Sequence, residues 1–157
     1  MLDNANLNEL IEKCGKLGKK KVREIMSRNV VTIKEDSKFI EFVTNIEMYD
    51  YVAFPVVDEK DEIIGIVSQT DLLKLISFHR HYGTTMLTTD VFLGILSIRA
   101  IMTTKPITLS PDDTVADAVQ LMVKYGIQNI PVVEEKRVVG MMVKKDIINQ
   151  ILSIIGL

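Results

Sequence analysis

A serine and an aspartate three residues apart are the side chains of this chain best placed to bind a small polar ligand. Ser68 ends an apolar, β-branched run that predicts a strand, and Asp71 falls in the first turn of the helix predicted to follow. Their hydroxyl and carboxylate, with the unpaired backbone N–H groups of the helix start, would converge on one spot. A carboxylate can accept hydrogen bonds from both hydroxyls of a ribose, as acidic residues do in dinucleotide-binding folds. The spot therefore suits a ribose phosphate.

The same two residues also have a purely structural interpretation. The pattern Ser-x-x-Asp fits a capping box, in which the two side chains bond to the backbone at the start of a helix. The sequence leaves both interpretations open.

The serine and the aspartate belong to the first of two similar stretches. Laying residues 22–76 over residues 98–151 aligns residues of the same type along the whole length, with one deletion in the second stretch. The matched groups are Ile25-Met26 with Ile101-Met102, Pro55-Val56-Val57 with Pro131-Val132-Val133, Gly65 with Gly140, and Asp71 with Asp146. Self-similarity on this scale indicates two copies of one supersecondary unit, which bury a face against each other. A ligand is expected in the cleft between two such halves.

Hydrophobic periodicity predicts the same order of elements in both stretches. A short β-branched run predicts a strand, and apolar residues at i, i+3, i+4 and i+7 then predict an amphipathic helix. A hairpin of two buried strands and a closing helix follow. The predicted β-α-β-β-α units comprise strands at 30–33 and 107–109, helix stripes Phe39/Phe42/Val43/Ile46 and Val115/Ala118/Val119/Met122, hairpins at 54–67 and 130–143, and closing helices at 70–78 and 145–155. Thr114 and Asp117 predict a capping box at the start of the second amphipathic helix.

Composition predicts an ordinary globular protein. The 157 residues are 47% hydrophobic and 25% charged, and a formal net charge of −2 gives no reason to expect nucleic acid as a partner. The single Cys14 excludes an internal disulfide and favours a reducing compartment. One basic run fits either a solvated face or an anion-binding surface: Lys13, Lys16, Lys19, Lys20, Lys21 and Arg23.

Nothing in the sequence indicates secretion or membrane insertion. Residues 1–10 are polar and acidic where a signal peptide would be basic and then apolar. The longest apolar stretches, at 91–98 and 151–157, are far shorter than the roughly 18 residues that predict a spanning helix. We therefore expect a cytoplasmic protein with no membrane partner.

Catalytic motifs are absent from the sequence. It contains no Walker loop, no nucleophile elbow, no convincing Cys–His pair and no dense carboxylate cluster. His79, Arg80 and His81 fit either a solvated helix end or a contact to a phosphate, and two histidines without a third ligand make a weak metal site. We expect a binding protein rather than an enzyme, with no metal and no cofactor other than a regulatory ligand.

The two hairpin regions resemble the signature of a CBS domain. Residues 51–58 with 64–72, and 126–133 with 139–147, are similar to that signature in the same order. The resemblance to a tandem CBS pair, or Bateman module, implies an α/β (α+β) fold in which two β-α-β-β-α repeats pack with pseudo-two-fold symmetry. The expected segments are a helical, basic lead-in at 1–21, a first CBS domain at 22–78, a connector at 79–97 and a second CBS domain at 98–155.

CBS pairs bind adenosine-containing ligands in clefts between their repeats, so the resemblance implies two sites here. The first would comprise Ile66, Ser68, Thr70 and Asp71 with Pro106, Ile107, Gly126, Ile127, Asn129 and Pro131. The second would comprise Met141, Val143 and Asp146 with Val30, Val31, Tyr51, Ala53 and Pro55. Gly126 would let its backbone approach a ligand closely, and it fits a helix C-cap equally well.

The second site departs from the pattern of the first. Val143 stands where the first site has Ser68, and Asp50 stands where the first site has Gly126. Valine cannot hydrogen-bond a phosphate, and a nearby carboxylate repels one. We expect this site to be empty, weak or filled by a ligand without phosphate.

The expected function is regulatory. An adenine nucleotide (AMP, ADP or ATP) would bind between the repeats and signal by a change of shape or pairing, through a separate protein partner or a homodimer. Two alternatives stay open: binding of S-adenosylmethionine or a related nucleoside, and a ligand-free structural dimerisation module.

Overall fold

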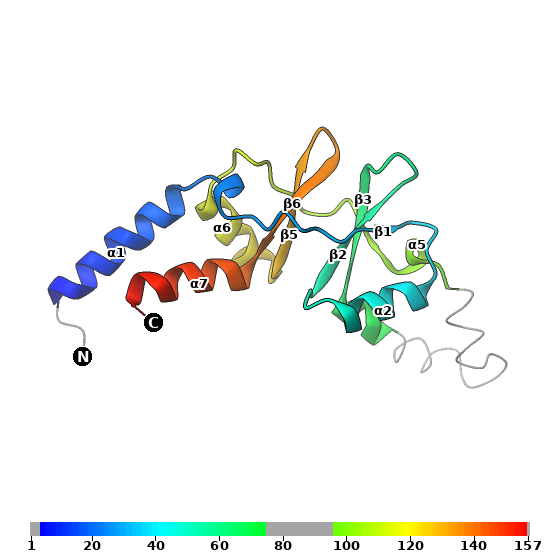
Figure 1. Ribbon diagram of the computed structural model, residues 1–157, viewed down its shortest axis with the longest axis horizontal. Coiled ribbons are helices and arrows are strands. Elements are labelled where there is room, and N and C mark those ends of the chain that lie inside the picture. The colour runs from blue at the N-terminus through cyan, green and yellow to red at the C-terminus, as the bar shows by residue number, and fades with distance from the viewer. Residues whose placement is uncertain (1–3, 75–95, 157) are drawn as a thin grey trace. The chain divides into compact units, whose positions relative to one another are not determined.

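The computed structural model describes residues 4–74 and 96–156 (Figure 1). The chain divides into two compact units that do not follow the two sequence repeats. Unit 1 joins Met1–Val30 to Ile107–Leu157, and unit 2 is Val31–Pro106. Most of the expected connector, including the cluster at 79–81, and the end of the first closing helix lie outside the described residues.

Unit 2 is a four-stranded sheet with helices packed on it. Its elements are β1 (Ile33–Lys34), α2 (Phe39–Met48), β2 (Ala53–Val57), β3 (Ile63–Ser68), a helix described over residues 69–74, α5 (Ile98–Ile101) and β4 (Thr103–Thr104). The strand order is β1-β2-β3-β4, with β1 parallel to β2 and the other neighbours antiparallel. The order predicted for the first repeat is present, and the start of the second repeat adds an edge strand to it.

The predicted stripe on α2 forms the core of unit 2. Phe39 and Phe42 are fully buried, and the Phe42 ring lies edge-to-face against Phe54 of β2, with centroids 6.2 Å apart. The other two residues of the stripe are partly buried against the same cluster. An edge-to-face pair of buried rings adds about 0.5–1.5 kcal/mol beyond the burial of area. This packing holds α2 on the hairpin whose second strand ends at Ser68.

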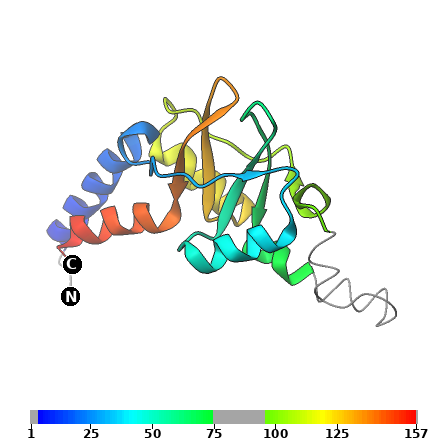
Figure 2. The same ribbon diagram turned by 45° about the vertical axis from the view of Figure 1, so that its right-hand side comes forward.

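Unit 1 combines a hairpin with helices from both ends of the chain. Its elements are α1 (Asn4–Lys19), the 3-10 turn η1 (Val22–Glu24), α6 (Val115–Tyr125), the antiparallel strands β5 (Asn129–Glu134) and β6 (Arg137–Val143), and α7 (Lys144–Ile155). In both views α1 lies beside α7 and runs antiparallel to it (Figures 1 and 2). Leu17 of α1 is buried in a core with Ala118 and Ile147. Among the described helices, none has both the length and the apolar character needed to cross a membrane.

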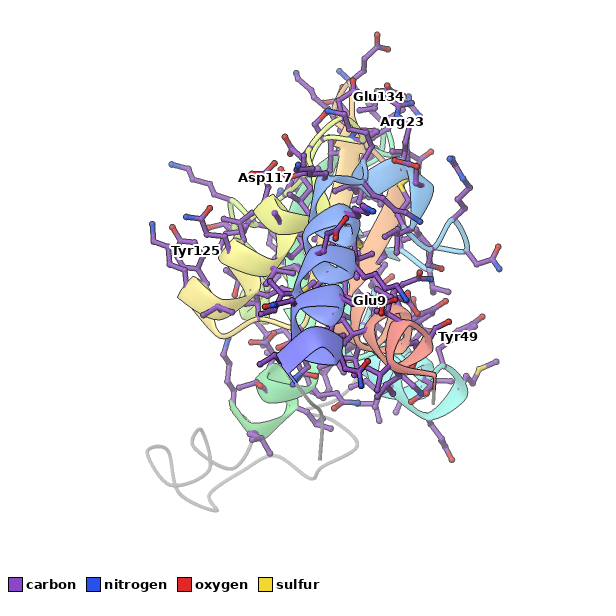
Figure 3. The ribbon with its side chains drawn as sticks, turned by 90° about the vertical axis from the view of Figure 1, so that its left-hand side faces the viewer. Glu9, Arg23, Tyr49, Asp117, Tyr125 and Glu134 are labelled. Carbon is purple, nitrogen blue, oxygen red and sulfur yellow. The ribbon has the colours of Figure 1, made fainter. Side chains whose placement is uncertain are left out.

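The predicted capping box begins α6. Thr114 Oγ1 accepts a hydrogen bond from the Asp117 N–H at 3.2 Å, and the Thr114 N–H donates to Asp117 Oδ2 at 2.9 Å. The bonds from the Thr114 backbone and then from its hydroxyl hold the pKa of the Asp117 carboxyl below its ordinary value of 3.8. Figure 3 shows Asp117 at the start of this helix and Tyr125 at its end.

The strands predicted at 30–33 and 107–109 are shorter than expected. Regular pairing is confined to β1 in the first case and to a single bridge between Leu109 and Val132 in the second. The chain passes from unit 1 to unit 2 between Val30 and Val31 and returns after Pro106. Because each segment passes from one unit to the other, it can pair with a strand of either unit over only part of its length.

The basic run before the first repeat is largely paired within unit 1. On α1, Lys13 and Lys16 pair with acidic residues one turn earlier, at 2.7 and 2.9 Å. Lys21 Nζ donates to the Asp112 carbonyl at 2.8 Å, and Arg23 pairs with the Asp112 carboxylate. These contacts favour the solvated, structural interpretation of the run over an anion-binding surface.

The segment that leads into the first repeat packs on the second repeat. In unit 1, the Ser27 N–H donates to the Met141 carbonyl at 2.9 Å and the Met141 N–H donates back at 2.8 Å. Next to this pair, a Cβ on Gly140 would lie 2.5 Å from the Met26 sulfur. The Val22 side chain is fully buried and its N–H donates to the Asp113 carbonyl.

The segment that leads into the second repeat makes the matching contacts on the first. In unit 2, β4 pairs with β3, and a Cβ on Gly65 would lie 2.7 Å from the Met102 sulfur and 2.9 Å from the Thr103 carbonyl oxygen. The Ile98 side chain is fully buried and its N–H donates to the Ser37 carbonyl. The two repeats thus exchange their lead-in segments, which is why Ile-Met and Gly recur together in the sequence.

The close approach at Gly65 gives a test of this exchange. We expect Gly65→Ala to lower the free energy of unfolding by about 1–3 kcal/mol, because an added methyl group in a packed contact forces the backbone to shift. Urea denaturation measures the change. Gly15→Ala on α1 is the control: its Cβ meets nothing within 4 Å, so it should raise stability by about 0.5–1 kcal/mol. A Gly65→Ala variant as stable as the parent would contradict the close packing of β4 on β3.

Candidate functional site

The carboxylate of Asp71 is buried at the start of the helix that follows β3. The residue is only 5% exposed. Its Oδ2 accepts hydrogen bonds from the Ser68 N–H at 2.7 Å and from the Ser68 hydroxyl at 3.2 Å. An acidic side chain that accepts from the residue three positions earlier is one half of a capping box. This half of the predicted capping box is present, and it uses one of the two carboxylate oxygens.

The second oxygen is held by a residue that the sequence analysis missed. Lys74 Nζ lies 2.5 Å from Asp71 Oδ1, and the lysine side chain is 54% exposed while that of the aspartate is 7% exposed. The available signal was the spacing, because acid and base three residues apart on a helix are neighbours. The ion pair joins a buried carboxylate to an ammonium group that reaches it from solvent.

The two oxygens of Asp71 are held by different kinds of partner. Removing an ionised carboxylate from water costs several kcal/mol unless other groups satisfy it. Ser68 satisfies one oxygen from within the fold, whereas Lys74 satisfies the other from a half-exposed position, where water and ligand hydroxyls can compete. Hydroxyl groups such as those of a ribose are chemically suited to take the place of that ammonium.

The remaining residues of the expected first site are divided between the units. In unit 2, Ile66 is half-buried on β3, Thr70 is exposed on the helix at 69–74, and Pro106 is half-buried at the unit's end. In unit 1, Ile107 and Ile127 are partly buried against the core. Ile66 and Thr70 lie on the strand and the helix predicted for them, whereas Ile107 lies outside any regular strand.

Gly126 ends α6 in the left-handed conformation, with φ of 63°. Its N–H donates to the Met122 carbonyl, which is the C-cap expected from the sequence. A Cβ at this position would meet nothing within 4 Å. The positive φ, and not crowding by the protein, is therefore what calls for glycine here.

Asn129 is the least satisfied polar residue of the expected site. It is the first residue of β5 and is only 5% exposed. Neither Nδ2 nor Oδ1 has a hydrogen-bond partner among the described residues. Leaving a buried amide unpaired costs about 1–3 kcal/mol, so such a group calls for a partner. Pro131, two residues further along β5, is buried and lies opposite Met141 of β6.

The expected second site also draws on both units, and its polar centre differs from that of the first. Val143 is the N-cap of α7 and makes no side-chain capping bond. Asp146 is half-buried, and no hydrogen bond joins it to that helix start among the described residues. Met141 is buried on β6, and Val30 is half-buried.

The second-site residues in unit 2 are largely engaged in packing. Ala53 and Pro55 are buried on β2, and Val31 is partly buried against the core. The ring of Tyr51 lies edge-to-face against Phe54 and stacks on Tyr49, with centroids 6.0 and 6.1 Å apart. These unit 2 residues therefore contribute mainly to the core of their own unit.

One hollow in unit 2 lies elsewhere. It has a volume of about 560 Å³, and none of the expected ligand residues lines it. Its wall consists of Lys34, Glu35, Asp36, Val57, Asp58, Glu59, Ser97 and Arg99. Arg99 pairs with Glu35 across it at 2.5 Å. In the described part of the chain, no cluster of three or more His, Cys, Asp or Glu side chains is arranged to hold a metal ion.

Comparison with known proteins identifies the repeat. The CBS domain family matches residues 22–78 and 98–153. An uncharacterised protein of Methanocaldococcus jannaschii is 31% identical over 137 residues, a stretch that covers 83% of this chain and 32% of that protein. The chain thus spans about a third of the length of this relative.

Solved structures share the fold. The CBS domain of a membrane protein from Sphaerobacter thermophilus matches with a TM-score of 0.73 at 22% identity, over 94% of this chain and 98% of that one. The CBS domain pair of protein MJ0100, solved with 5′-methylthioadenosine and S-adenosyl-L-methionine, matches with a TM-score of 0.69 at 26% identity, over 83% and 94%. These matches confirm the mixed α/β fold expected from the sequence. With two family matches in tandem, this chain belongs to the CBS domain family as a tandem CBS pair.

Proposed function

We propose that this chain is a regulatory module that binds an adenosine-containing small molecule, with Asp71 as the residue that holds the ribose. The observation that carries the proposal is the buried Asp71 carboxylate, which has one oxygen fixed by Ser68 and the other held by a half-exposed lysine. A ribose offers two adjacent hydroxyl donors to such an acceptor. The MJ0100 CBS pair, at 26% identity, supports the ligand class because both of its bound molecules contain adenosine.

Two kinds of adenosine ligand have separate support. The Lys74 ammonium is a donor that a phosphate prefers, which favours AMP, ADP or ATP. The ligands of the MJ0100 pair favour S-adenosylmethionine or a related nucleoside. Both kinds present the same ribose to Asp71.

Asn129, in unit 1, is proposed as a second ligand-binding group. Its unpaired amide offers N–H donors on Nδ2 and an acceptor on Oδ1, the combination that an adenine edge complements. Apolar strand residues follow it on β5. A buried, neutral amide in such surroundings suits a base better than it suits a phosphate.

Self-association through helices is part of the proposal. α7 carries a second apolar stripe of Ile148, Leu152 and Ile155, which are exposed although spaced at i, i+4 and i+7. A partner helix from a second copy would bury this stripe. Ligand-dependent pairing would then give the module its output, in a homodimer or toward a regulated protein.

The ligand class is tested by thermal shift with adenosine, AMP, ADP, ATP, S-adenosylmethionine and 5′-methylthioadenosine. A compound at 100 times its dissociation constant should stabilise the protein by about 2.7 kcal/mol. GMP serves as the control for binding of any ribose phosphate. If no adenosine compound shifts the transition, the ligand-free dimerisation module becomes the better description.

The role of Asp71 is tested by Asp71→Ala. We expect affinity for the best adenosine compound to fall by about 10- to 150-fold, because charged hydrogen bonds worth roughly 1.5–3 kcal/mol are lost. Isothermal titration calorimetry measures the affinity. Asp117→Ala is the matched control, since it removes an N3 capping carboxylate from α6 and should lower stability without changing affinity. If the two variants bind the adenosine compound with equal affinity, then Asp71 acts only as a helix cap.

The role of Asn129 is tested by Asn129→Asp, a change of nearly the same shape. The carboxylate keeps the acceptors and loses the donor, so adenosine compounds should bind at least about tenfold more weakly relative to guanosine compounds. The measured quantity is the ratio of the two affinities, which a general loss of stability does not move. Asn149→Asp makes the same change at an exposed position on α7. An unchanged ratio in Asn129→Asp would exclude contact with the base.

A further inference from the structure

Lys74 contacts two groups that lie far apart in the sequence. Its Nζ is 2.5 Å from Asp71 Oδ1, and it donates a hydrogen bond to the Ile101 carbonyl oxygen at 3.0 Å. An ammonium group has three donors and can hold both acceptors at once. Lys74 thereby joins the carboxylate of Asp71, which is proposed to bind the ribose, to the segment that leads into the second repeat.

The Ile101 carbonyl lies at the C-terminal end of a short helix. α5 is a single turn that ends at Ile101, and its last carbonyl groups have no partners within the helix. A cation beside such a helix end satisfies one carbonyl and complements its partial negative charge. Lys74 thus helps to hold the end of α5.

The segment beyond Ile101 belongs to the sheet that carries the site. Immediately after it, β4 pairs with β3, Thr103 opposite Ile66 and Thr104 opposite Gly65. Ile66 is two residues before Ser68, the partner of Asp71. Segment 98–104, by which we mean α5 and β4 with the residue between them, is therefore connected to the site by strand pairing and by Lys74.

We infer that Lys74 is a positioning residue that couples occupation of Asp71 to the order of segment 98–104. The ligand half of this inference rests on the function proposed above. Oδ2 already accepts two hydrogen bonds from Ser68, so we expect a ligand hydroxyl at Oδ1, where it would take the place of the half-exposed Lys74. When the lysine leaves the carboxylate, the Ile101 carbonyl loses a donor that the buried anion had held in place. Binding then loosens segment 98–104, which is the lead-in segment of the second repeat that packs on the first.

The link is tested first without any ligand, by hydrogen exchange at the amides of segment 98–104. Lys74→Met removes the ammonium and keeps an unbranched, helix-favouring side chain. We expect exchange in this segment to become roughly 2- to 12-fold faster, the effect of losing one hydrogen bond. Asp71→Asn should produce the same change, and the double variant should not exceed the single ones, because both act on one connection.

Lys60→Met is the matched control, because Lys60 is an exposed lysine in the β2–β3 turn of the same unit. It should leave exchange in segment 98–104 unchanged. If Lys74→Met behaves like this control, or if the effects of Lys74→Met and Asp71→Asn add, then the inference is overturned.

The coupling is tested next with adenosine, which has no phosphate to contact the lysine. Adenosine should speed exchange of segment 98–104 in the parent protein and have no such effect in Lys74→Met. By thermodynamic reciprocity, Lys74→Met should bind adenosine more tightly, by the same roughly 2- to 12-fold factor. If binding is normal but exchange is unaltered, the coupling fails while the proposed function stands. If adenosine does not bind, the proposed function fails at this site, and the ligand-free comparison alone decides the role of Lys74.

Discussion

The close approach of a lead-in segment to a glycine is the contact on which the rest of the structure depends. Met26 lies on Gly140 in unit 1, and Met102 lies on Gly65 in unit 2, at positions where any Cβ would collide with the methionine sulfur. Each contact continues into backbone pairing with the neighbouring strand. Because each repeat contributes its lead-in to the other, neither sequence repeat contains all the residues that complete its own sheet. Folding of each unit therefore requires both halves of the chain.

The polar chemistry of unit 2 is placed on that framework. Asp71 follows β3, the strand that β4 pairs with, and its carboxylate is more buried than an ionised group tolerates without partners. Ser68 supplies permanent partners from the backbone and the hydroxyl. Lys74 supplies a third partner from solvent. The combination serves stability as a helix cap and leaves the second carboxylate oxygen to a half-exposed partner, so the structural role of this aspartate is compatible with its proposed ligand-binding role.

The two repeats share a framework and differ in how their helix starts are satisfied. In the first repeat Asp71 is bonded to Ser68, whereas in the second Val143 precedes α7 without a capping side chain. The second repeat has its capping box instead at the start of α6, through Thr114 and Asp117. The buried amide of Asn129 also belongs to one repeat only, because the residue that aligns with it in the first repeat is Ala53. Duplication has thus preserved the apolar packing more closely than the polar groups.

The sequence by itself determined the elements, the repeat and the family, because apolar periodicity and turn residues are local and survive in each copy. It also identified the cap at Thr114, the C-cap at Gly126 and the pairing of Ser68 with Asp71, all of which span only a few residues. It did not determine which repeat each lead-in segment packs on, because Met26 and Gly140 meet only when distant parts of the chain fold together. The full strands expected at 30–33 and 107–109 were wrong for the same reason, since the chain changes units beside them. Tertiary structure alone decided that Lys74 bridges Asp71 to the Ile101 carbonyl, because one of its partners lies 27 residues away.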